Sequence, residues 1–444
     1  MQSGLSSLKF IFLATGGGYK GLFADFDTMF WSGVLRIVYA IVSSAPFLVS
    51  GLVITGLLRG VIGPARIKRL LGVGKWYSPI SAWFLGLLIP ICSFGALPVA
   101  RELRRSGVPS GTIISFVMVA PVLNPISIAF GLSYIHPIIL LYFGVGTFLV
   151  SSGIGLIWNY LICPDVGLGN QILNREPPLN NINRLLLSFD TSVKAFFGPM
   201  LFDYFLALTA VGLLGAFLPY GSMQTGFTRD NFFAPIIMSS VAIPMYITPM
   251  DVMMQFGQIA RDGYSLGCAF VLIVLGAGAN VGLANWLRRD YGRRAVSYFV
   301  AMLITSTIVL GFITDRSIVH GKATIDDHTH AFDGLTRLDG VNAEEAGFIW
   351  VWGKVKSSIN KHADSAAAEI FGLILLAFMF LAGLVSVLKQ DQDFITRIYD
   401  PPVRLTRDTP TVFNKVLTYR QLAGVCSIGF CCMVAVCLFV YYPE

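Results

Sequence analysis

The sequence contains one pattern of broken apolar segments twice, and the two copies align without a gap. The first copy runs from Pro79 to Asn124 and the second from Pro235 to Asn280, at a fixed offset of 156 residues. The same offset joins three further pairs of identical residues: Arg105 and Arg261, Gly107 and Gly263, and Gly111 and Gly267. The duplication predicts a fold made of two similar halves.

The composition places both halves in a membrane. Hydrophobic residues make up 55% of the 444 residues, charged residues make up 13%, and the mean hydropathy is +0.69. A chain of this composition cannot cover its apolar surface in water. Its long apolar runs also lack the alternation of barrel strands. We therefore expect an all-α polytopic membrane protein.

The basic residues indicate which loops lie in the cytoplasm. One basic loop precedes the first broken segment and another follows it: Arg59, Arg66, Lys68, Arg69 and Lys75, then Arg101, Arg104 and Arg105. Because short basic loops stay inside, a complete crossing between them would put one on the wrong side. We expect instead a re-entrant hairpin over about 79–99 that turns at Pro90 to Gly95. Basic cytoplasmic loops also account for the net charge of +7, so no nucleic-acid partner is expected.

The same reasoning along the whole chain predicts an inverted-repeat helical bundle with two re-entrant broken hairpins and about eight full spans. The second hairpin is expected over 232–259, and the spans over about 37–58, 109–134, 138–162, 196–218, 266–287, 295–313, 367–388 and 422–442. Both termini are then expected outside the cytoplasm.

This topology divides the chain into six parts. They are an external N-terminal segment (1–30), the first repeat (31–162), a cytoplasmic linker (163–195), the second inverted repeat (196–313), an external acidic and histidine-containing loop (314–366) and two C-terminal helices with a cytoplasmic loop between them (367–444). Inverted repeats with broken segments that meet near the bilayer midplane are typical of transporters.

Polar residues inside the apolar segments are candidates for a solute pathway. Asn124 and Asn280 lie deep in apolar sequence, where an unpaired amide is costly, so they either bond the broken backbone or line the pathway. The paired glycines are equally consistent with close helix packing alone.

Two carboxylates are candidates for coordinating or coupling an ion. Asp251 follows Pro244 and Thr248 in the second hairpin, where it could bind a cation, carry a proton or cap a helix at the external interface. Asp203 lies within the span 196–218. It is either a coupling acid or the partner of an arginine near the cytoplasmic face.

The external loop holds a weak metal-like cluster: His320, Asp326, Asp327, His328 and His330. Imidazole and carboxylate groups bind divalent transition ions, but a solvated acidic loop explains the same residues. No phosphate-binding loop and no catalytic motif is present, so neither a cofactor nor an enzymatic activity is expected.

The run from Ile89 to Ala100, with Gly107–Gly111 after it, resembles the signature of the predicted-permease family that includes the organoarsenical efflux permeases. Residues Pro90, Cys92, Ser93, Gly95 and Pro98 match that signature. The resemblance covers about residues 37–313 and implies a permease of the bacterial plasma (inner) membrane.

One residue departs from the family pattern. Phe94 stands where the family has a second cysteine. A trivalent arsenical is a soft ion that prefers several thiolates, so the resemblance implies a permease without implying this substrate.

Three hypotheses follow. The chain is a secondary exporter that moves a small ion or metal(loid)-type solute by alternating access, a channel on the same scaffold, or a non-transporting scaffold or intramembrane enzyme. The duplication favours the first two, because a scaffold needs no pseudo-symmetry about a midplane. The cysteine-rich run 422–442, outside the duplication, is a candidate contact for a homo-oligomer.

The two asparagines provide a test. We expect Asn124→Ala and Asn280→Ala each to abolish solute flux in proteoliposomes while folded protein remains in the membrane. Normal flux in both variants would leave only the helix-packing interpretation.

Overall fold

The structure is a computed structural model that describes residues 19–162, 181–197, 199–218, 226–229, 231–318 and 363–388, with a few isolated residues elsewhere. Apart from one isolated bridge between Thr228 and Tyr264, the regular structure in these ranges is helical, as expected. The N-terminal part comprises α2 (Tyr19–Leu57), the π-helix η1 (Leu58–Ile62), α3 (Pro64–Leu70), α4 (Ser78–Gly86), α5 (Ser93–Arg105), α6 (Ser110–Val119), α7 (Pro125–Tyr134), α8 (Pro137–Ile157) and η2 (Trp158–Ile162).

The remaining helices follow after residues 163–180, which are not described. They are α9 (Asn181–Lys194), α10 (Pro199–Phe217), α11 (Ala234–Ala242), α12 (Pro249–Arg261), α13 (Leu266–Gly276), α14 (Val281–Tyr291), α15 (Arg293–Ser317) and α17 (Ala363–Leu388).

Five segments of the described residues are long and apolar enough to cross a bilayer: Thr28–Ile62, Pro137–Ile162, Met200–Phe217, Arg293–Ser317 and Ala367–Ser386. They coincide with five of the eight expected spans. The expected spans 109–134 and 266–287 are each broken into two short helices, and the pair α13 and α14 is bent by 52°. The eighth, 422–442, lies outside the described residues.

The duplication is visible in the helix bounds. Helices α4 and α5 begin and end at positions that lie 156 residues before the bounds of α11 and α12. Each pair is interrupted at the same place, by residues 87–92 in the first half and 243–248 in the second. Pro90 and Pro244 lie in these breaks, where a residue without an amide hydrogen cannot continue a helix.

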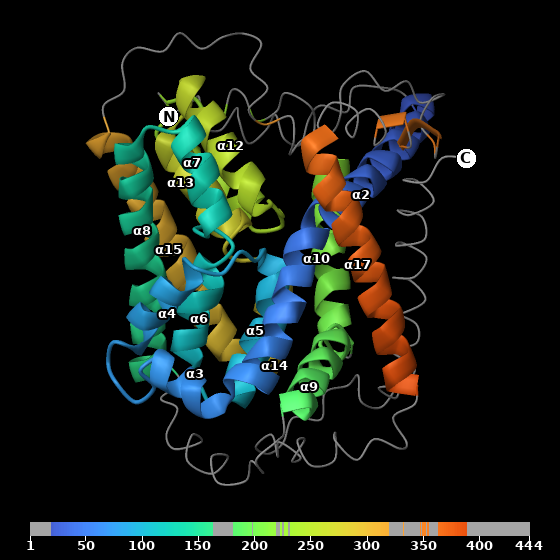
Figure 1. Ribbon diagram of the computed structural model, residues 1–444. Helices are drawn as coiled ribbons and strands as arrows, with labels where there is room; N and C mark the ends of the chain where they lie inside the picture. The colour runs from blue at the N-terminus through green and yellow to red at the C-terminus, as the bar shows by residue number, and fades with distance from the viewer. Residues whose placement is uncertain are drawn as a thin grey trace.

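In each half, the end of the second helix of the pair contacts the segment that precedes the first helix. At the end of α5, the Glu102 carboxylate lies 4.0 Å from the Arg59 guanidinium in η1. The Ser265 amide, after α12, donates to the Phe227 carbonyl, before α11, at 3.1 Å. Figure 1 shows α4, α5 and α6 in the lower half of the molecule, whereas α12 and α13 lie in the upper half.

In each half, one glycine crossing holds a short helix against a long helix. Gly111 of α6 lies against Gly155 of α8, and Gly267 of α13 lies in the same way against Gly311 of α15. The Gly111 amide donates to Asn159 Oδ1 at 2.7 Å, and the Gly267 amide donates to the equivalent Asp315 Oδ1 at 2.7 Å. These four glycines therefore allow close backbone approach, as the packing interpretation requires.

Two elements differ from the sequence-based expectation. The segment 163–195, interpreted as a linker, contains the helix α9, which packs on α2 and α17. Its Asp190 carboxylate accepts a hydrogen bond from Ser386 of α17 at 3.0 Å. Helix α2 begins at Tyr19, within the segment 1–30 that was assigned to an external N-terminal region. The polar composition of the segment concealed α9, because most of the apolar residues of this helix lie on one of its faces.

The glycine crossings can be tested by adding one methyl group. In Gly111→Ala the new Cβ would meet the Gly155 carbonyl, whereas the Cβ in Gly153→Ala, on the partner helix α8, has no described atom within 4 Å. Overpacking of this kind costs about 1–3 kcal/mol. We expect a lower thermal unfolding midpoint in detergent for Gly111→Ala only. Equal midpoints for both variants would contradict the close approach.

Candidate functional site

Four helices begin at the breaks, and each has a side chain that caps its first turn. Cys92 precedes α5, Asn124 precedes α7, Thr248 precedes α12 and Asn280 precedes α14. Cys92 and Thr248 are equivalent under the duplication, as are Asn124 and Asn280. Helix starts leave backbone N–H groups without intrahelical partners, so caps are most needed where water is scarce.

The two asparagines are buried and differ in how completely they are bonded. Asn124 Oδ1 accepts from the amides of Ile126 at 3.0 Å and Ser127 at 2.9 Å, and its Nδ2 donates to the Ala120 carbonyl at 3.1 Å. Asn280 Oδ1 accepts from the Leu283 amide at 2.8 Å. Its Nδ2 has no hydrogen-bond partner among the described residues. Both side chains accept backbone amide hydrogens at a helix start, and of the two only Asn280 has a side-chain donor, Nδ2, without a described partner.

The two breaks meet through aromatic side chains. The ring of Phe94, at the start of α5, stacks on the ring of Tyr246 in the second break, with centroids 4.3 Å apart and planes 3° apart. Tyr204 of α10 packs edge-on against Phe94 at 5.5 Å and donates its hydroxyl hydrogen to the Phe94 carbonyl at 2.8 Å. The residue that replaces the second cysteine of the family signature therefore joins the two halves.

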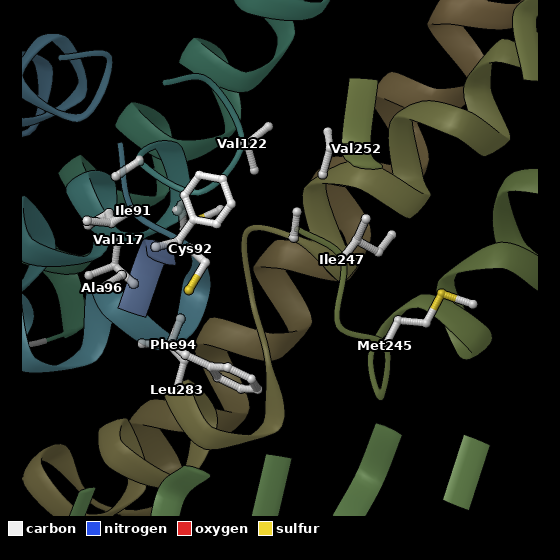
Figure 2. Close-up of a cluster of buried hydrophobic side chains, with 14 of the residues drawn as sticks. Ile91, Cys92, Phe94, Ala96, Val117, Val122, Met245, Ile247, Val252 and Leu283 are labelled. Atoms are coloured by element: carbon white, nitrogen blue, oxygen red, sulfur yellow. The ribbon is translucent and has the colours of Figure 1, made fainter. Parts of the chain in front are cut away.

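An apolar cluster surrounds this contact. Figure 2 shows Cys92 and Phe94 from the first half gathered with Ile247 from the second break and Leu283 from α14. All four side chains are buried. Cys92 Sγ accepts the Gly95 amide at 3.3 Å, so the thiol already acts as the cap of α5. The stack of Phe94 on Tyr246 brings the start of α5 to the second break, and Leu283 brings the first turn of α14 to the same place.

The remaining signature residues lie in α5 and shape its contact with α2. Gly95 approaches the backbone of α2 at Phe47 and Gly51 so closely that a Cβ on Gly51 would collide with it. Pro98 lies inside α5 and is buried, as is Ser93 in its first turn. The match to the family signature thus describes a break, a capped helix and a tight helix contact.

Asp251 lies in the first turn of α12 and is exposed. Its carboxylate accepts the Thr248 hydroxyl hydrogen at 2.7 Å, and its amide donates to Thr248 Oγ1 at 3.2 Å. The equivalent position in the first half is the buried Gly95. The geometry is that of a helix cap, with a carboxylate that remains accessible at the second break.

Asp203 is fully buried in α10 and has charged and polar partners on α14. Its carboxylate accepts from Arg289 at 2.9 Å and from the Asn285 amide at 2.6 Å. Asn285 in turn accepts from Arg288 at 2.9 Å. Of the two alternatives for Asp203, the structure shows the arginine pair, which ties α10 to the end of α14 that carries the basic residues.

The expected metal-like cluster of His320, Asp326, Asp327, His328 and His330 lies outside the described residues. Within the described part of the chain, no group of three or more His, Cys, Asp or Glu side chains is placed to hold a metal ion.

Sequence reasoning missed Tyr204 and Tyr246. Tyr246 occupies the position equivalent to Pro90 in the first break, so the duplication could have drawn attention to it. Tyr204 carried no comparable signal, because its contact with Phe94 depends on how the span 196–218 docks on the first hairpin.

Comparison with known proteins gives one family and two relatives. A family model described as "Predicted permease" matches residues 31–316. The UPF0718 protein YcgR of Bacillus subtilis (strain 168) is 23% identical over 285 residues, which are 61% of this chain and 91% of that protein. A Streptococcus mutans protein named "Putative two-component membrane permease complex subunit" is 26% identical over 127 residues, 28% of this chain and 41% of that protein. No solved structure matches significantly.

The buried pair between Asp203 and Arg289 can be measured with a double-mutant cycle. Removing one partner of a buried ion pair typically costs about 3–5 kcal/mol, because the other charge stays buried and unpaired. We expect Arg289→Gln and Asp203→Asn each to lower the thermal unfolding midpoint. The double variant should recover part of the loss, whereas strictly additive losses would show that the two side chains do not interact.

Proposed function

Because the chain belongs to the predicted-permease family, we propose that it is a secondary exporter of the bacterial plasma membrane. It moves a small ion or metal(loid)-type solute by alternating access between two inverted repeats, and it does not catalyse a reaction. The observation that carries the proposal is the contact between the two breaks, in which Phe94 of one hairpin stacks on Tyr246 of the other. Broken helices of two repeats that meet in this way are typical of a transport site.

The positions of the hairpins support an inverted arrangement. Helix α5 lies in the lower half of the molecule and its equivalent α12 lies in the upper half, while the equivalent pair α14 and α7 lie in the lower and upper halves respectively (Figure 1). In the proposed topology the lower end faces the cytoplasm. It carries the ends of α5 and α14, with Arg104, Arg105, Arg288 and Arg289. The positive-inside rule favours that orientation.

Equivalent helices have different partners, which supports two alternating states. At the lower end, α5 packs against α2 and α14 packs against α10. At the upper end, the equivalent helices α12 and α7 pack mainly against each other. Gly257 of α12 lies against Tyr134 of α7, and Arg261 lies over the ring of Tyr134 at 5.8 Å. Exchanging the two packing modes between the halves would generate the opposite state.

In this scheme the structure is one of the two alternating states, in which the two ends of the molecule are packed differently. The pair of Asp203 and Arg289 and the bond from Tyr204 to Phe94 tie α10 to α14 and α5. Gly51 and Gly95 bring α2 and α5 into contact. At the other break, Asp251 is exposed.

Flux through purified protein tests the proposal. We expect proteoliposomes to move a solute from a panel of small inorganic ions and metalloid species, detected by mass spectrometry, at a rate that increases when a proton gradient is imposed. Protein-free liposomes provide the baseline. Flux that is indifferent to the gradient and linear in voltage would identify a channel and exclude the coupled exporter. No flux of any species would exclude both.

A further inference from the structure

The four helix starts at the breaks carry unequal charge. A helix N-terminus has a partial positive charge of about half an elementary charge. Helix α12 has Asp251 in its first turn, whereas α5, α7 and α14 have no acidic residue there. Three of the four helix starts are therefore capped only by neutral side chains, and their positive ends remain uncompensated.

The same three helices carry buried polar groups that have no partner. Ser93 in the first turn of α5, Ser127 in the first turn of α7 and Asn280 at the cap of α14 are 2%, 0% and 5% exposed. Among the described residues, nothing bonds Ser93 Oγ, Ser127 Oγ or Asn280 Nδ2. An unbonded buried group costs about 1–3 kcal/mol. The Asn280 amide nitrogen can only donate, so the atom that satisfies it must be an acceptor.

Two of these groups belong to residues that adjoin the contact between the breaks. Ser93 directly precedes Phe94, whose ring stacks on Tyr246. Asn280 holds the amide of Leu283, and the Leu283 side chain lies beside Phe94 (Figure 2). The buried Tyr246 hydroxyl lies near the Cys92 thiol, without a hydrogen bond of normal geometry to any described residue. Hydroxyl and amide donors thus gather where two uncompensated helix starts approach each other.

The other solute classes have less support at this place. The candidate ligand for a cation at the breaks is the Asp251 carboxylate, which already accepts the Thr248 hydroxyl hydrogen. A soft metalloid would have one thiol, because Cys268, the other described cysteine, lies in α13 away from the breaks. Donors without partners and uncompensated helix starts complement negative charge.

We propose that the solute bound between the breaks is a small anion, held by the first turns of α5 and α14 together with the Ser93 hydroxyl and the Asn280 amide. This inference rests on the proposed transport function and names the substrate class of the same site. The Asn280 Nδ2 group and the Ser93 hydroxyl donate to the anion, and Asp251 repels it from the start of α12.

Anion binding to the purified full-length protein tests the inference. The thermal unfolding midpoint is followed while chloride, sulfate or nitrate replaces the bulky anion gluconate at constant ionic strength, because a ligand that binds the folded state stabilises it. We expect a saturable rise with at least one of the three anions. Sulfate also stabilises proteins non-specifically, so the decisive quantity is the difference between the wild type and the variants.

Two variants remove the donors without removing a cap. Ser93→Ala deletes an unbonded hydroxyl, and Asn280→Asp keeps the acceptor for the Leu283 amide while replacing the donor with a negative charge. We expect each to weaken the apparent anion affinity by about tenfold or more, the usual effect of one hydrogen bond to a charged group. Asp251→Asn should strengthen it. The matched control is Ser152→Ala, which also removes a buried serine hydroxyl without a described partner, but from the long helix α8; it should titrate like the wild type.

The outcomes separate this inference from the transport function. The absence of a saturable rise with all three anions, or identical titrations of the wild type, Ser93→Ala and Asn280→Asp, would overturn the anion site. The anion site would also be overturned if a divalent cation or phenylarsine oxide stabilised the wild type and this stabilisation were lost in Asp251→Asn. Anion binding without flux in proteoliposomes would overturn the exporter and leave the site. Flux of cations alone would overturn the anion site and leave the exporter.

Discussion

The structure depends on one constraint: helices that stop and restart inside apolar surroundings must still satisfy their backbone hydrogen-bonding groups. Cys92, Asn124, Thr248 and Asn280 meet this constraint at four helix starts by accepting amide hydrogens. Their short side chains reach back to the first turn, which longer or apolar side chains cannot do. The same interruptions, which leave backbone groups to be satisfied, also bring helix dipoles and polar side chains close together.

The two halves are alike in their internal contacts and unlike in their external ones. The crossing of Gly111 with Gly155 has its equivalent in that of Gly267 with Gly311. In both, a side-chain oxygen at the equivalent position, Asn159 or Asp315, accepts the amide hydrogen of the first glycine. By contrast, α5 packs on α2 while its equivalent α12 packs on α7. If each half is to move as a rigid unit, the contacts within it must be preserved while its contacts with other helices change.

Much of the local structure could be predicted from the sequence. Both breaks follow from Pro90 and Pro244, and the fixed offset transfers each bound from one half to the other. The contacts between halves could not be predicted, because the stacking of Phe94 on Tyr246 depends on how two copies dock. Asp203 illustrates the same limit, since its partner Arg289 lies 86 positions away and the sequence offered several arginines. Helix α9 was missed because its polar face dominates its composition.

The stacked rings of Phe94 and Tyr246 lie where α5 begins, and this position makes α5 a lever. A helix of 13 residues is about 20 Å long, so a rotation of about 10° around the stack would leave Cys92 nearly stationary while displacing the far end by roughly 3 Å. Arg105 and the ion pair between Glu102 and Arg59 lie at that far end. A movement of several ångströms at the Arg105 end would therefore produce only a small shift in the space between the breaks.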